Sequence, residues 1–491
     1  MEILFGTAGL LPEDQTQVLA RLRPRIAQRG LACRENIITQ DFCVLALGDE
    51  EMPLCSRVTE SKSGVLGWAG HLVFPELPHW PDAARLDRCL NGNMIGVLPD
   101  LDGLYAVARY DKDHRTLCLA TDRYAMFPLF ILQAKGGLLF STSADLLMWS
   151  SPKQLHFDPL AAAEFIHFRG CLGDKTFARE ITRTSPGQAS FFDFREKKLS
   201  SKTYFSYADM PAPYMDNATE VVELLVPALE SAVRRRLPPN KKINCMLSGG
   251  FDSRTICTVL DRLCVPFDTY TIDSDLGKID DLYISRLVSQ SLQTTNTDIP
   301  QPLDYLERFW KSKCMAIDFA TTMHAWAMPL AQTSQMSGAL NYDGLGGDVI
   351  LRAFVLSPDS LNDLLEGNLP ELSDYVFKDN CKTKNLEHVL DPRLGDSWFR
   401  GTCDSLTSEL SPLLGNPNGI FHLTRRAVGP STCCLMAAKL QNFAPFLDHQ
   451  VFEACMSVLP TEKFGHKLYR QLMRAINPVV ARIPSSNDSY K

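Results

Sequence analysis

The segment from Leu247 to Arg254, LSGGFDSR, contains residue types that together can bind a phosphate chain. Paired glycines let backbone N–H groups approach an anion closely, and a helix that starts there adds the positive end of its dipole. The hydroxyls of Ser248 and Ser253 can donate to phosphate oxygens. Asp252 can hold Mg²⁺, a hard cation that prefers carboxylate and phosphate oxygens. The segment therefore predicts a site for a magnesium nucleotide.

Such a segment needs a strand before it and a helix after it. INCMLS is a short buried strand candidate, and SRTICTVLDRL carries apolar residues at helical spacing. FDTYTID, at 267–273, is the next strand candidate. The order strand, helix, strand predicts a parallel sheet of the nucleotide-binding kind. From this half of the chain we expect ATP contacts from Leu247, Ser248, Gly249, Gly250, Asp252, Ser253 and Thr271.

The first 200 residues have a different pattern. Short apolar runs such as LYAVARYD, TLCLATD and GGLLFST alternate with Gly, Pro and Asp, which favours strands and hairpins. A polar, proline-containing stretch at 200–216 separates them from the helical pattern that follows. We predict one domain over 1–205 and a second over 216–491.

Composition narrows the class of protein. The 491 residues include 45% hydrophobic and 22% charged residues, with a formal net charge of -7, which argues against a nucleic-acid or anionic-membrane surface. No apolar run approaches the roughly 20 residues that cross a bilayer, and the start has no signal-peptide pattern. The 15 cysteines form no C-x-x-C pair. We therefore expect a cytoplasmic protein.

The loop SGGFDSR resembles the SGGxDS pyrophosphate loop of the N-type ATP pyrophosphatases. That group includes asparagine synthetase and GMP synthetase. No G-x-x-x-x-G-K-[ST] loop is present, which disfavours Walker-type γ-phosphoryl transfer. The resemblance implies that ATP is cleaved between its α- and β-phosphates, giving an adenylate and pyrophosphate.

Three further stretches resemble the asparagine synthetase family. DGLGGD at 343–348 is similar to its second glycine-rich loop, NFAPFLD at 442–448 to its R-x-P-F-L-D segment, and 101–147 to its amidotransferase domain. The resemblance implies an α/β protein with an N-terminal amidotransferase-like (Ntn-type) α+β domain, followed by a parallel-sheet ATP pyrophosphatase domain. It also implies that Gly346 and Gly347 contact ATP, and that Asp348 is catalytic and shares Mg²⁺ with Asp252.

The resemblance also points to a catalytic lysine on a late helix, in the stretch GHKLYRQLMRAINP. Lys467 is the candidate, although counting four residues back from Arg470, as the family spacing requires, selects His466. A lysine there would stabilise negative charge in the transition state. Weaker candidates for substrate contacts are His324, Trp326, Arg425, Arg426, Asp273, Asp275, Asp280 and Asp281.

Two departures from the family pattern bear on the substrate. Glutamine-dependent members start Met-Cys, whereas residue 2 here is Glu, which implies that glutaminase activity is absent. β-Lactam synthetases and lasso-peptide cyclases share this loss. Leu345 occupies the position of a family Glu, or of the Tyr of β-lactam synthetases.

These departures favour a ligase that joins a carboxylate to an amine as a lasso-type peptide macrolactam cyclase. Its partners would then be a precursor peptide and leader-processing proteins. An ammonia-using asparagine synthetase-like or other small-molecule amide ligase stays open, as does a non-catalytic nucleotide-binding scaffold.

Overall fold

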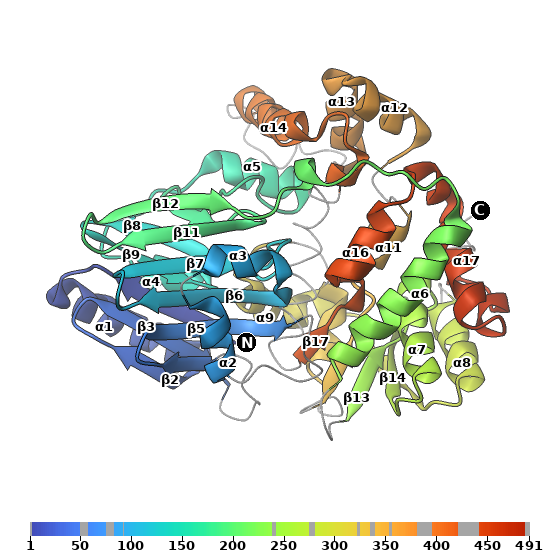
Figure 1. Ribbon diagram of the computed structural model, residues 1–491, viewed down its shortest axis with the longest axis horizontal. Coiled ribbons are helices and arrows are strands. Elements are labelled where there is room, and N and C mark those ends of the chain that lie inside the picture. Colours follow the sequence, from blue (N-terminus) through green and yellow to red (C-terminus); the bar gives the residue numbers. More distant parts are fainter. Residues whose placement is uncertain are drawn as a thin grey trace.

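The computed structural model describes residues 2–49, 57–74, 83–91, 93–237, 242–273, 280–321, 325–333, 339–352, 356–380, 395–420 and 441–486. Figure 1 shows two halves side by side: antiparallel sheets built from the first part of the chain, and a helix-covered sheet built from the second. Among the described helices, none is both long enough and apolar enough to cross a membrane.

The N-terminal half contains two antiparallel sheets packed face to face. Apolar side chains of both sheets, such as Leu4, Phe42, Val65 and Leu117, form the core between them. The first sheet has the order β10-β8-β9-β1-β3-β2 and the second the order β12-β11-β7-β6-β5-β4. The strands are β1 Ile3–Ala8, β2 Ala32–Ile38, β3 Phe42–Gly48, β4 Arg57–Glu60, β5 Gly64–Val73, β6 Asp102–Asp111, β7 Thr116–Thr121, β8 Phe130–Ala134, β9 Gly137–Ser141, β10 Ile181–Arg183, β11 Gln188–Asp193 and β12 Lys198–Thr203.

Helices cover the outer face of each sheet. Val18 and Leu22 of α1 and Leu147 of α4 pack on the first sheet, while Leu86 and Leu90 of α2 pack on the second. The result is a helix–sheet–sheet–helix sandwich, which confirms the predicted α+β, amidotransferase-like first half. The helices are α1 Pro12–Gln28, α2 Ala83–Leu90, α3 Met94–Val97, α4 Ala144–Ser150 and α5 Pro159–Phe168.

The C-terminal half contains the predicted parallel sheet, with the order β15-β14-β13-β16-β17. Its strands are short, between three and six residues each. They are β13 Ile243–Met246, β14 Asp268–Asp273, β15 Asn296–Pro300, β16 Leu340–Tyr342 and β17 Gln441–Phe443. The helices described around them are α6 Ala218–Arg235, α7 Phe251–Arg262, α8 Asp281–Ser291, α9 Tyr305–Ile317, α10 Met328–Ala331, α11 Gly347–Arg352, α16 His449–Met456 and α17 Lys467–Ile476.

A small helical lobe lies above the junction of the two halves in Figure 1. It comprises α12 Pro358–Glu366, α13 Leu369–Asn380 and α14 Gly395–Leu410, which share an apolar core with Leu172 just beyond α5. In the chain, this lobe lies between β16 and β17.

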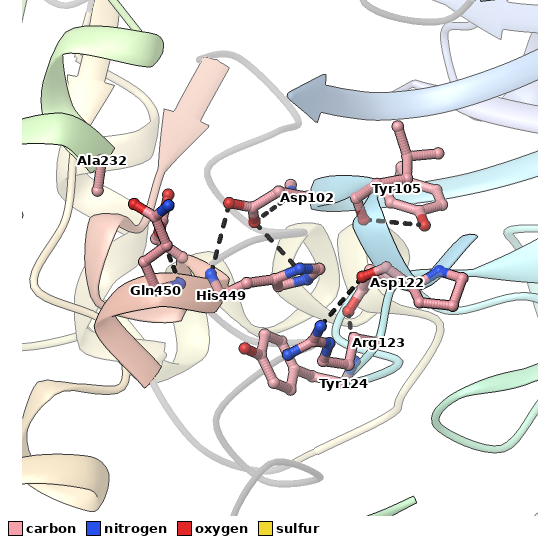
Figure 2. Close-up of polar contacts among 12 residues, drawn as sticks. Asp102, Tyr105, Asp122, Arg123, Tyr124, Ala232, His449 and Gln450 are labelled. Carbon is pink, nitrogen blue, oxygen red and sulfur yellow. Dashed lines mark hydrogen bonds and ion pairs between the residues drawn. The ribbon is translucent and has the colours of Figure 1, made fainter. Parts of the chain in front are cut away.

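Buried ion pairs join the two halves. Asp102, at the start of β6, lies 3.2 Å from Arg236 Nη2, and Arg236 Nη1 lies 2.6 Å from Asp448 Oδ2. Figure 2 shows Asp102 beside His449, whose backbone N–H donates to the Asp102 carboxylate over 3.4 Å. Burial alone would raise the pKa of Asp102, but the guanidinium of Arg236 holds it below its ordinary value. This junction fixes the start of α16, directly after the NFAPFLD segment.

A second buried ion pair also joins the two halves. Arg29, at the end of α1, pairs with Asp318 at the end of α9 over 3.0 Å and with Asp145 of α4 over 3.1 Å. Because both junctions are largely removed from solvent, they hold the amidotransferase-like half in one position on the parallel-sheet half.

Candidate active site

The loop between β13 and α7 is the predicted phosphate-binding turn. The backbone N–H of Ser248 donates to Ser253 Oγ over 3.0 Å, and the two hydroxyl oxygens lie 3.1 Å apart. Gly250 is the N-cap of α7 and supplies no side-chain cap, so the N–H groups of the first turn keep their capacity to bind an anion. Ser248, Gly250 and Asp252 are all partly exposed. The strand–turn–helix prediction is confirmed.

The second glycine-rich loop lies against the first turn of α7. A Cβ added to Gly344 would lie 2.6 Å from the backbone nitrogen of Ser253, and one added to Gly347 would lie 2.9 Å from Asp252 Oδ1. Gly346 has a φ of +88°, a conformation that L side chains rarely adopt. Only glycines permit this approach, and it brings Asp348 to Asp252.

The two aspartates share one electrostatic environment. Burial raises the pKa of Asp252 well above its ordinary value, and the neighbouring charge of Asp348 raises it further. Burial also raises the pKa of Asp348, against the opposing effect of Arg352. The backbone N–H of Asp348 and the hydroxyl of Tyr469 both donate to Asp252. Two carboxylates held together in this way fit a site for a divalent cation.

Asp343 fixes the second loop. Its carboxylate accepts the backbone N–H of Leu345 over 3.1 Å and the side-chain amide of Asn442 over 3.0 Å. Asn442 in turn accepts from the amide of Asn341 over 2.5 Å. Burial raises the pKa of Asp343 to about 6. The side chain of Leu345 packs into the apolar core.

Some predicted residues lie away from this cluster. Lys467 is half exposed, and its Nζ lies 2.5 Å from Glu462 Oε1. His466, the alternative register, is buried, with its ring 5.3 Å from that of Phe251 in the first turn of α7. The hydroxyl of Thr271 donates to Asn296 Oδ1 over 3.0 Å.

The residues that the structure brings together at the two loops are therefore Ser248, Gly249, Gly250, Asp252, Ser253, Gly346, Gly347 and Asp348. Leu247 is buried just before them, and its N–H donates to the carbonyl of Tyr270 over 2.9 Å.

Two contacts of this site were not predicted. Tyr469, in the first turn of α17, was missed because nothing in its own segment marks it as a partner of Asp252. Asp281 was only a weak candidate, yet its carboxylate accepts the N–H of Gly249 over 2.9 Å.

Of the other weak candidates, Asp273 ends β14, Asp280 precedes α8 and Trp326 is exposed, whereas Asp275, His324, Arg425 and Arg426 lie outside the described residues.

Two family models match parts of the chain, and one of the matched parts contains the loop from Ser248 to Ser253. Residues 225–341 match the asparagine synthase family, and residues 91–205 match the glutamine amidotransferase domain.

A putative glutamine-hydrolyzing asparagine synthetase of Methanocaldococcus jannaschii is 23% identical over 74% of this chain and 57% of its own length. The glutamine-hydrolyzing asparagine synthetase of Gallus gallus is 24% identical over 40% of this chain and 35% of its own. The chain thus spans little more than half of the first relative and about a third of the second. Among solved structures, a glutamine phosphoribosylpyrophosphate amidotransferase from B. subtilis gives a TM-score of 0.25 at 10% identity, covering 62% of this chain and 70% of that one.

Proposed function

This chain belongs to the asparagine synthetase family, and on that premise we propose that it is an ATP-dependent ligase that joins a carboxylate to an amine. The substrate carboxylate attacks the α-phosphorus of ATP and releases pyrophosphate. The amine then attacks the acyl carbon, forms the amide bond and releases AMP. The observation that carries the proposal is the apposition of Asp252 and Asp348 across the two glycine-rich loops.

In this proposal Asp252 and Asp348 hold Mg²⁺. The cation would neutralise negative charge on the phosphates. Within the described ranges, no group of three or more His, Cys, Asp or Glu side chains gathers to hold a metal. Two carboxylates suit a cation that completes its shell with phosphate and water oxygens, which is how Mg²⁺ is commonly bound.

The remaining loop residues bind and orient the phosphate chain. The hydroxyls of Ser248 and Ser253 and the N–H groups at the start of α7 face the same partly exposed turn, where they can donate to pyrophosphate oxygens. The N–H of Gly249 is bonded to Asp281 and that of Gly250 to Ser248 Oγ, over 3.2 Å. A bound phosphate must therefore exchange with these internal partners.

We further propose that the amidotransferase-like half does not hydrolyse glutamine, because Glu2 and not a cysteine immediately precedes β1. A carboxylate cannot replace a thiolate as the nucleophile of this reaction. The amine would then be free ammonia or an amine of the substrate. Incubation with glutamine should yield no glutamate, and steady glutamate release would contradict this part of the proposal.

The finer proposal is a peptide macrolactam cyclase of the lasso type, which acts in the cytoplasm on a precursor peptide. It is supported by Leu345, whose buried side chain offers neither the Glu of asparagine synthetases nor the Tyr of β-lactam synthetases. A small-molecule amide ligase is the second candidate, favoured by the naming of both relatives as asparagine synthetases.

An ATP–pyrophosphate exchange screen tests these proposals. The substrates are aspartate, other amino acids, ammonia and leader-bearing peptides, each with magnesium ATP. Exchange that depends on a peptide supports the cyclase, whereas exchange with aspartate supports the small-molecule ligase. If no substrate gives exchange, and an Asp252→Asn variant keeps full biological activity, the chain is a nucleotide-binding scaffold.

A further inference from the structure

The carbonyl of Gly249 receives hydrogen bonds from several directions at once. Arg254 Nη2 donates to it over 3.0 Å, the backbone N–H of Ser486 over 3.0 Å and the hydroxyl of Ser485 over 3.3 Å. Ser485 and Ser486 lie more than 200 residues further along the chain and are both buried against the loop.

Arg254 connects the loop to this distant segment. Its side chain is fully buried, and besides Gly249 it donates to the carbonyls of Ile483 and Pro484, each over 2.7 Å. A planar guanidinium with several fixed donors can bridge three carbonyls, which a lysine ammonium on its flexible stem does poorly. The segment Ile483–Ser486 and α7 are thereby joined on one side of the Gly249–Gly250 peptide.

The orientation of that peptide matters for phosphate binding. A trans peptide is planar, so its C=O and N–H point in opposite directions. With the Gly249 carbonyl bonded to Arg254, the Gly250 N–H points the other way, toward Ser248 Oγ in the partly exposed part of the turn. Because both residues are glycines, the peptide could otherwise flip at low steric cost and direct a carbonyl oxygen toward the phosphates, which would repel them.

We propose that Arg254, together with the segment Ile483–Ser486, is a positioning element that locks the Gly249–Gly250 peptide with its N–H toward the pyrophosphate of the nucleotide. The inference rests on the proposed function. In this role Arg254 supports binding of the β- and γ-phosphates of ATP indirectly, by holding the loop in place. It makes no contact with the adenosine.

Binding of two probes separates this role from general stabilisation. Magnesium pyrophosphate reports on the loop, and AMP reports on the rest of the nucleotide site. In Arg254→Lys, the affinity for magnesium pyrophosphate should fall about tenfold or more, as loss of charge-assisted hydrogen bonds implies. The affinity for AMP should change less than about twofold. Ser485→Ala removes one donor and should weaken pyrophosphate binding by about two- to threefold.

Arg262→Met is the matched control, since Arg262 lies on the same helix and pairs with Glu230 at the surface. It should leave both affinities unchanged. Should Arg254→Lys fail to fold, as judged by circular dichroism, Ser485→Ala decides alone. Unchanged pyrophosphate binding in the folded variants, or equal losses for both probes, would overturn the inference and leave the proposed function intact. Wild-type protein that binds neither magnesium ATP nor pyrophosphate would overturn both.

Discussion

The hydroxyl of Tyr469 donates a hydrogen bond to the carboxylate of Asp252, which ties α17 to the phosphate-binding loop. The ring of Tyr469 also stacks on Phe251, with centroids 5.5 Å apart. A residue near the end of the chain thus sets both the position and the charge of the aspartate that we propose as a metal ligand.

Tyr469→Phe should weaken magnesium-dependent ATP binding by about tenfold, because a hydrogen bond to a charged group contributes about 1.5–3 kcal/mol. Its loss disfavours the ionised form of Asp252, which is the form that binds a cation. Isothermal titration calorimetry measures the change. Tyr283→Phe on the exposed face of α8 is the control and should bind as the wild type does. Equal affinities in both variants would exclude this role for Tyr469.

Magnesium ATP binding should weaken as the pH falls, beginning above the range of ordinary carboxyl groups. The pKa values of Asp252 and Asp348 are raised, so both take up protons at a higher pH than free aspartate, and bound Mg²⁺ must displace those protons. In the absence of ligand, a fall in pH has the opposite effect on the stability of the fold, which increases. The folded protein holds more protons than the unfolded chain between the ordinary and the raised pKa, so these groups add stability as the pH falls.

Calorimetry in buffers of different ionisation enthalpy should therefore detect proton release on binding at a pH above the range in which ordinary carboxyl groups titrate. In Asp348→Asn the pKa of Asp252 should fall, because a neighbouring negative charge is gone, and the residual binding should release fewer protons. An affinity that is constant from about pH 8 to pH 5 would argue against a raised carboxyl pKa at this site.

His466→Ala should reduce ATP–pyrophosphate exchange more than Lys467→Ala does. The ring of His466 packs against Phe251 beside the loop, whereas the ammonium of Lys467 is half exposed and paired with Glu462. We expect at least a tenfold loss in the first variant, equivalent to about 1.4 kcal/mol, and less than about a twofold change in the second. The opposite order of effects would support the sequence-based prediction that Lys467 is the catalytic residue.

Asp102→Asn should destabilise the protein by about 3–5 kcal/mol, since it leaves the buried guanidinium of Arg236 without one of its charged partners. Chemical denaturation measures this difference. Glu230→Gln removes the partner of Arg262 in a partly exposed pair and should cost less than about 1 kcal/mol. Similar losses in the two variants would mean that the junction between the halves contributes little to stability.

Local sequence was enough to predict the strand–turn–helix around Ser248 and the change from antiparallel to parallel sheets. Each depends on residues close together in the chain. The contacts of Asp252 with Tyr469 and of Gly249 with Ser486 join segments more than 200 residues apart, and nothing in either segment specifies the other.

The register at Lys467 was uncertain for a local reason. Gly465 and His466 both have left-handed backbone, with φ of 62° and 61°, so α17 starts after a bend that helical periodicity does not reveal. Helical spacing counted back from Arg470 therefore does not carry through to the residues before Lys467.

The most direct test of the central claim is binding of magnesium ATP to the wild type and to Asp252→Asn and Asp348→Asn. The account predicts magnesium-dependent binding by the wild type and a loss of at least about tenfold in each variant, with circular dichroism unchanged. Wild-type protein without magnesium-dependent affinity for ATP, or variants that bind as tightly as the wild type, would contradict it.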